Sequence, residues 1–131
     1  MYLVDTNVIS ELMRPRPAPR VVDWAGGIDR FALSVVTLEE VWYGLSVRHS
    51  VRLERWFNDF TQTYCNILAI TPTVARRSAG LRARLRTLGK TRTQADMLIA
   101  ATAAEHDLIL VTRNVRDFND CGLQLLNPFG P

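Results

Sequence analysis

Four acidic residues stand where carboxylates can do chemistry. Asp5 directly follows the first short apolar run of the chain, and Asp117 lies shortly after the fourth such run. Glu40 and Asp96 lie on segments whose apolar residues have helical spacing. In parallel α/β sheets, ligands bind beyond the carboxyl ends of the strands. The polar residues that follow each strand are therefore the first candidates for a functional site.

Further polar residues accompany the two acids that follow apolar runs. Thr6 and Asn7 come directly after Asp5, and Thr112, Arg113 and Asn114 come directly after the fourth run. If the first and fourth runs are neighbouring parallel strands, both groups lie at the same edge of the sheet.

Simpler structural roles also fit four of these positions. An Asp between a strand and a helix is a good N-cap, and this fits Asp5. Thr37 followed by Glu40 has the spacing of a capping box, in which Glu40 reaches back to the start of its own helix. Asn114 and Asp117 lie in a segment typical of a turn. The sequence alone leaves these alternatives open.

Asp96 is harder to explain structurally. The segment 94–106 is apolar nearly all round, so we expect its one early carboxylate to be largely buried. An unpaired buried charge is costly and should be paired or bound to a metal. The helix dipole favours an anion in the first turn by only about 0.3–1 kcal/mol. We therefore favour a functional role for Asp96 over a salt bridge or cap.

Clustering of the four acids would itself require a cation. Two carboxylates roughly 5 Å apart repel by about 3 kcal/mol at an effective dielectric constant of about 20. A divalent cation removes that cost. Oxygen ligands without Cys or His suit Mg²⁺ or Mn²⁺ better than zinc, and such a site can act on a phosphodiester.

The elements that would position these residues alternate along the chain. We expect short strands at 2–4, 31–34, 67–70, 108–111 and 123–126. We expect helices at 6–13, from about 19 to 26, after Thr37, and at 51–64, 73–88 and 94–106. Short apolar strands alternating with helices predict an α/β fold with a parallel sheet covered by helices on both faces.

Composition sets the broad class. The chain has 131 residues, 47% of them apolar and 22% charged, which predicts one globular domain over 1–131. The two cysteines, Cys65 and Cys121, have no partner at metal-ligand spacing. No stretch reaches membrane-spanning length and no secretory signal opens the chain, so we expect a cytoplasmic protein without membrane contact.

Four blocks, in order, resemble PIN-domain ribonuclease toxins of the VapC/FitB type. The first runs from Leu3 to Glu11, and the second from Ser34 to Val41 with Gly44 beyond it. The third is 96–101, and the fourth is 111–114 together with Asp117 and Phe118. The resemblance implies a PIN-like fold and the toxin of a type II toxin–antitoxin module. It further implies a Mg²⁺- or Mn²⁺-dependent endoribonuclease that hydrolyses RNA with a metal-bound water, forms a homodimer and is neutralised by a VapB-type antitoxin.

The resemblance also implies roles for individual residues. Three positions match the acidic metal-binding triad of the family: Asp5, Glu40 and Asp96. Three polar positions match residues that support that site: Thr6, Asn7 and Thr112. In the fourth block, members of the family carry an acid at the position of either Asn114 or Asp117, so either residue could complete the site.

A basic segment supplies a candidate RNA-binding surface. Residues 76–92 carry seven cations and no acid. The candidates for contact with the RNA backbone are Arg82, Arg84, Arg86, Lys90 and Arg92. A solvated helix face, or a surface for an acidic antitoxin segment, explains the same pattern.

Other classes of protein fit less well. A haloacid-dehalogenase-like phosphatase requires Asp-x-Asp, whereas this chain has Asp5-Thr6-Asn7. Nucleotide-binding domains require a glycine-rich phosphate loop, which is absent. The main alternative is a non-catalytic PIN-like module that binds RNA or a partner protein.

Overall fold

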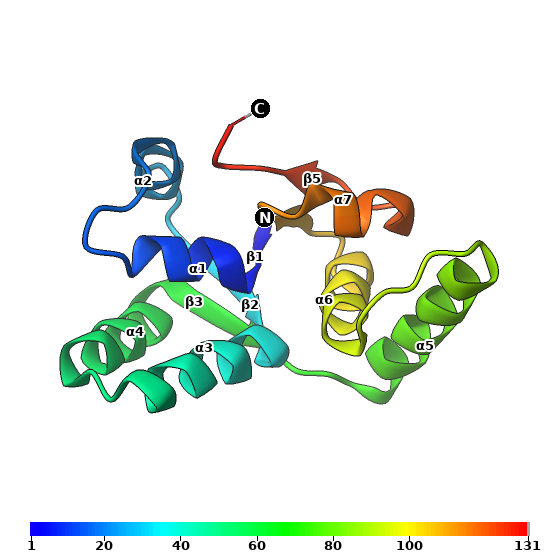
Figure 1. The fold of residues 1–131 in the computed structure, drawn as a ribbon, viewed down its shortest axis with the longest axis horizontal. Helices are drawn as coiled ribbons and strands as arrows, with labels where there is room; N and C mark the ends of the chain where they lie inside the picture. Colours follow the sequence, from blue (N-terminus) through cyan, green and yellow to red (C-terminus); the bar gives the residue numbers. More distant parts are fainter. Residues whose placement is uncertain (131) are drawn as a thin grey trace.

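The computed structural model describes residues 1–130 and contains one five-stranded parallel sheet (Figure 1). The strands are β1 (Tyr2–Val4), β2 (Phe31–Ser34), β3 (Cys65–Leu68), β4 (Ile109–Val111) and β5 (Leu125–Leu126). Their order is β3-β2-β1-β4-β5, and every pairing is parallel. The parallel sheet predicted from the sequence is confirmed.

The central strand brings the first and fourth apolar runs side by side. Leu3 of β1 pairs with Ala32 on one side and with Leu110 on the other. Immediately beyond β1, the Asp5 amide donates to the Val111 carbonyl at 2.9 Å. The neighbourhood of β1 and β4, on which the predicted site depended, is therefore present.

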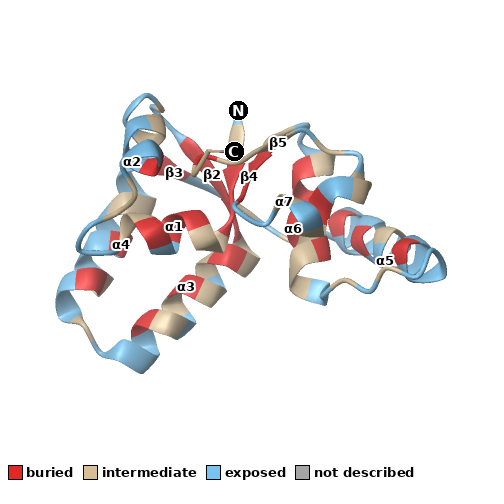
Figure 2. Cartoon of the chain, turned by 45° about the horizontal axis from the view of Figure 1, so that its top comes forward, coloured by how far each residue is buried: buried red, intermediate tan, exposed pale blue. Residues whose placement is uncertain are grey.

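Two layers of helix enclose the sheet (Figures 1 and 2). The helices are α1 (Thr6–Leu12), α2 (Pro19–Gly26), α3 (Val35–Arg48), α4 (Val51–Tyr64), α5 (Pro72–Thr87), α6 (Gln94–Glu105) and α7 (Val115–Phe118). A short 3-10 helix, η1 (Asn119–Cys121), follows α7. Helices α1 to α4 form one layer and α5 to α7 the other.

Successive side chains along each strand point to opposite faces of the sheet, so one hydrophobic core forms under each helical layer. Val4, Leu33 and Val111 point into a core shared with α1 to α4. Their neighbours Leu3 and Leu110 point into a second core shared with α5, α6 and α7. Because both faces of the strands are buried, β1, β2 and β4 read in the sequence as continuous apolar runs.

The third strand differs from its predicted position. We expected it at 67–70, but β3 is Cys65–Leu68, in register from Phe31↔Cys65 to Ser34↔Leu68. It is an edge strand, so its polar residue Asn66 can be exposed. The side chain of Arg30 secures it by donating from Nε to Asn66 Oδ1 at 2.8 Å. The apolar run was a poor guide because half of this strand faces solvent.

Glu11 is a buried acid that the sequence did not single out. It is 7% exposed, and its Oε2 accepts from the Ala18 amide at 2.8 Å, fixing the start of α2. Its Oε1 pairs with the exposed Arg14 at 3.2 Å. We expect Glu11→Ala to lower the free energy of unfolding by about 2 kcal/mol, because the charge-assisted bond from the Ala18 amide to a buried carboxylate is lost. In urea titrations Glu11→Gln, which keeps the acceptor oxygen, should lose much less; equal losses would contradict this role.

Cys65 and Cys121 both have free thiols in the structure. Burial raises the pKa of the Cys65 thiol to about 12, although Arg30 opposes the shift. Because only the thiolate reacts, Cys65 should stay unlabelled by iodoacetamide at pH 8 in the folded protein and react once urea unfolds it. Peptide mass spectrometry separates it from the more exposed Cys121, and rapid native labelling of Cys65 would contradict the structure.

Within residues 1–130, no helix is long and apolar enough to cross a membrane.

Candidate active site

Asp5 lies at the junction of β1 and α1, where the chain leaves the sheet. It is the N-cap of α1, and the Thr6 amide donates to its Oδ1 at 2.8 Å. Its Oδ2 accepts from Thr112 Oγ1 at 2.8 Å and from Asn7 Nδ2 at 3.2 Å. The capping role and the site role therefore coincide, and the carboxylate is held from three directions.

Glu40 belongs to the same edge, and its predicted structural role is wrong. Ser34, not Thr37, is the N-cap of α3, because the extended end of β2 lets Ser34 Oγ accept from the Val36 amide at 3.1 Å. Glu40 therefore lies too far into the helix to close a capping box. Its Oε1 instead accepts from Thr6 Oγ1 at 2.6 Å. This bond joins α3 to the start of α1, next to Asp5.

The displaced cap leaves the Thr37 hydroxyl without a partner. Thr37 is fully buried, and its Oγ1 makes no hydrogen bond within the described residues. Replacing Thr37 by Val keeps the shape and removes an unsatisfied polar atom. We expect the free energy of unfolding to stay equal or rise by up to about 1 kcal/mol. A clear loss of stability in urea titration would show that the hydroxyl has a partner.

Asp96 lies in the first turn of α6, where Thr93 is the N-cap. The Asp96 amide donates to Thr93 Oγ1 at 3.1 Å. The carboxylate is half-buried, less than the sequence predicted. Burial raises its pKa, and the charges of Asp5, Asp117 and Glu40 raise it further, against a smaller lowering by the Thr93 hydrogen bond. Thr93 was not selected from the sequence, although its spacing of three residues from Asp96 is a capping signal.

The same repulsion acts on Asp5. Burial raises its pKa most, and the charge of Glu40 adds to it, while hydrogen bonds from Thr112, Thr6 and Asn7 lower it. No arginine, lysine or histidine in residues 1–130 forms an ion pair with Asp5, Glu40 or Asp96. The structure therefore brings the predicted acids into one electrostatic neighbourhood and gives them no protein cation.

The fourth block contributes one support and one further acid. Thr112 is fully buried, and its Oγ1 also accepts from the Asn114 amide at 3.0 Å. Asn114 is exposed and makes no side-chain cap to α7. Asp117, on α7, is half-buried and is one of the charges that raise the pKa of Asp96. Of the two alternatives for this block, Asp117 is the residue whose charge acts on Asp96.

The donor set has the chemistry of a site for a hard cation. It consists of carboxylates supported by hydroxyls and an amide, without His or Cys. Within the described chain, however, no three Asp, Glu, His or Cys side chains lie close enough together to enclose one metal ion. Thus the acids share an edge and repel one another, but they stand apart.

The five predicted RNA-binding cations do not form one strip. Lys90 pairs with Asp120 at 2.9 Å, and Arg84 donates to the Asp120 carbonyl at 3.4 Å. Arg92 lies 3.8 Å from the Asp120 carboxylate and donates from Nε to the Asp117 carbonyl at 2.9 Å. Arg82 and Arg86 face an open groove beside α5.

Known proteins resemble this chain over the residues that form the site. The model of the PIN domain family matches residues 2–122, which is most of the chain and includes all four acids. This chain belongs to the PIN domain family. The identification confirms the resemblance that the four sequence blocks carried, and with it the fold class.

Individual relatives cover almost the whole chain. It is 33% identical to the VapC ribonuclease Y4jK of Sinorhizobium fredii, over 100% of this chain and 99% of the relative. It is 34% identical to the toxin FitB of Neisseria gonorrhoeae, over 98% and 99%. The crystal structure of FitAcB from Neisseria gonorrhoeae superposes with a TM-score of 0.86 at 32% identity, covering 98% of this chain and 99% of that one.

Proposed function

We propose that this PIN-domain protein is the toxin of a type II toxin–antitoxin module and acts as a divalent-metal-dependent endoribonuclease. The observation that carries the proposal is the convergence of acidic charge on Asp96. The charges of Asp5, Asp117 and Glu40 act on its carboxylate, and none of the four acids has an ion-pair partner within residues 1–130. Relatives named as a VapC ribonuclease and a toxin support the activity.

Asp5, Glu40 and Asp96 are the residues that would hold Mg²⁺ or Mn²⁺, with Asp117 nearby as the fourth acid. When bound, such a cation neutralises the carboxylates, acidifies a water and stabilises the charge that develops on a phosphodiester. Because the carboxylates stand apart in the structure, binding should draw them together. The raised pKa values of Asp5 and Asp96 express the repulsion that binding would relieve.

The surrounding residues orient the carboxylates. Thr112 and Asn7 both donate to Oδ2 of Asp5 and so fix the orientation of its carboxylate. Thr6 performs the same task for Glu40. The Asn7 side chain is itself held, because its Oδ1 accepts from the Arg113 amide at 3.0 Å. This network fixes the orientation of the Asp5 and Glu40 carboxylates, as outer-shell partners of metal ligands do.

The proposed partners are an RNA substrate, a VapB-type antitoxin and a second copy of the chain. Support for the antitoxin comes from similar structures described as a toxin-antitoxin complex from Klebsiella pneumoniae and as FitAB bound to a DNA fragment. The cytoplasm is the proposed compartment, since its RNA is the proposed substrate.

The test is cleavage of several structured RNAs by the purified protein in Mn²⁺ or Mg²⁺, against EDTA, beside an Asp96→Asn variant. The proposal expects cleavage that needs metal and is lost in the variant. A second candidate, a non-catalytic RNA- or partner-binding module, expects no cleavage of any RNA and binding that EDTA leaves unchanged. Cleavage that persists in EDTA would contradict the metal-dependent mechanism.

A further inference from the structure

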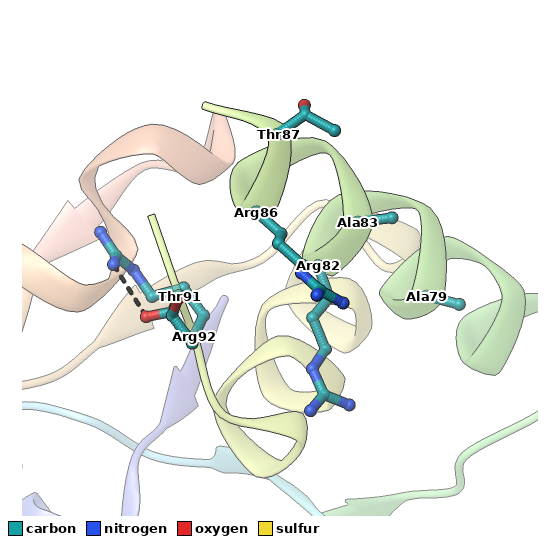
Figure 3. Close-up of a pocket in the computed structure, with 7 residues that line it drawn as sticks. All are labelled: Ala79, Arg82, Ala83, Arg86, Thr87, Thr91 and Arg92. Carbon is teal, nitrogen blue, oxygen red and sulfur yellow. Dashed lines mark hydrogen bonds between the residues drawn. The ribbon is translucent and has the colours of Figure 1, made fainter. Parts of the chain in front are cut away.

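An open basic groove runs beside α5 on the second helical layer (Figure 3). It has a volume of about 990 Å³. It is lined by three arginines, two threonines and two alanines: Arg82, Arg86, Arg92, Thr87, Thr91, Ala79 and Ala83. No acidic side chain lines the groove. Its floor and walls thus offer guanidinium and hydroxyl donors with only small apolar groups between them.

Arg82 and Arg86 supply the free charge of this groove. They lie four residues apart on α5, and their side chains point the same way, into the groove (Figure 3). Both are exposed, and neither forms an ion pair with a carboxylate in residues 1–130. Each guanidinium carries five donors in a planar fork that matches a phosphate. Two such forks on one wall are suited to an extended anion.

The opposite wall is fixed and leads to the acids. The loop that carries Thr91 and Arg92 is secured by the ion pair between Lys90 and Asp120. The Arg92 Nε bond to the Asp117 carbonyl ties the same wall to α7. The next residue, Thr93, caps the helix turn that carries Asp96. Arg92, which lines the groove, therefore contacts the backbone of one site acid, Asp117, and lies four residues before another, Asp96.

We propose that this groove is a subsite for the phosphates of an RNA strand that flank the bond cut at the acidic edge, with Arg82 and Arg86 as its phosphate ligands. The proposal rests on the proposed ribonuclease function and adds to it the path of the substrate. RNA fits better than a protein segment because the groove offers no large apolar or aromatic anchor, which protein interfaces require at their centre.

The test uses the full chain in EDTA, so that binding is measured without cleavage. The probe is a fluorescein-labelled single-stranded oligoribonucleotide of mixed sequence, followed by anisotropy between 50 and 200 mM salt. The variant is Arg82→Ala/Arg86→Ala. The control is Arg52→Ala/Arg55→Ala, which removes the same charge from exposed positions on α4, in the other helical layer. Circular dichroism verifies that both variants are folded.

Loss of two phosphate contacts should reduce the salt slope by about 1.4. The affinity of the wild type should therefore fall about sevenfold more than that of the Arg82/Arg86 variant across this fourfold range of salt. The control should keep the wild-type slope. Equal effects of both variants, or no effect of either, would overturn the subsite.

A labelled polyglutamate peptide tests the rival occupant. If the Arg82/Arg86 variant binds RNA normally but loses the peptide, the groove serves an acidic protein segment and the proposal is wrong. The cleavage assay separates this result from the proposed function. Metal-dependent cleavage with unchanged RNA binding would overturn the subsite alone, whereas a changed salt slope without any cleavage would overturn the nuclease alone.

Discussion

Asp96→Asn should abolish cleavage and, at the same time, stabilise the metal-free protein. The activity should fall by at least about a hundredfold, because loss even of a group that orients a metal ligand costs about 10–100-fold. Stability should rise because burial and three neighbouring acids raise the pKa of Asp96 in the folded state, so its ionised form is disfavoured there. The amide keeps the shape and removes the charge.

The sign of this effect can be verified by pH. A carboxyl with a raised pKa destabilises the folded state when it is ionised. This penalty shrinks as the pH falls through the raised pKa of the folded state and is gone below the ordinary value of 3.8. In EDTA the melting temperature of Asp96→Asn should therefore exceed that of the wild type at pH 7, and the gap should close in acid. Asp59→Asn, an exposed acid on α4, is the matched control. A less stable Asp96→Asn protein at pH 7 would contradict the repulsion.

Thr112→Val should reduce both stability and activity. The Thr112 hydroxyl is buried, donates to Asp5 Oδ2 at 2.8 Å and accepts from the Asn114 amide at 3.0 Å. Valine has the same shape and can do neither. We expect the free energy of unfolding to fall by about 2 kcal/mol, the usual contribution of a hydrogen bond to a charged group. Cleavage should fall about 10–100-fold, since Asp5 loses an orienting donor.

Thr37→Val provides the matched control for this prediction. Both threonines are fully buried, but only the Thr112 hydroxyl has partners. Urea titrations of the two variants should therefore diverge, with Thr112→Val destabilised and Thr37→Val unchanged or more stable. Similar losses in both would mean that the change from Thr to Val, and not the Asp5 contact, causes the effect.

The sequence was sufficient to predict contacts between candidate residues where the backbone geometry determines them. Asp5 and Thr112 meet because parallel neighbouring strands end at the same edge, and the apolar runs of β1 and β4 were easy to recognise. Glu40 shows where such reasoning stops. Its spacing from Thr37 is that of a capping box, yet the helix is capped three residues earlier, by Ser34 at the end of β2. Glu40 therefore accepts a hydrogen bond from Thr6 instead. Competition between two good caps depends on where the strand ends.

The sequence also could not predict contacts between residues that lie far apart along the chain. The cations of 76–92 form a single basic run in the sequence, but in the structure Asp120 engages Lys90 and Arg84 and leaves Arg82 and Arg86 free. The segment that contains Asn114 and Asp117 suggested a turn, whereas residues 115–118 form the short helix α7, from which the charge of Asp117 acts on Asp96. Each outcome depends on tertiary contacts that no local pattern contains.

Direct measurement of Mn²⁺ binding tests whether the acids of the sheet edge form one cation site. Free aqueous Mn²⁺ gives an electron paramagnetic resonance signal that weakens on binding to protein. The wild type should bind Mn²⁺ at a saturable site, Asp59→Asn should bind it equally well, and both Asp5→Asn and Asp96→Asn should lose it. If the free Mn²⁺ signal weakened to the same extent with all four proteins, or with none, the acids would not form a cation site.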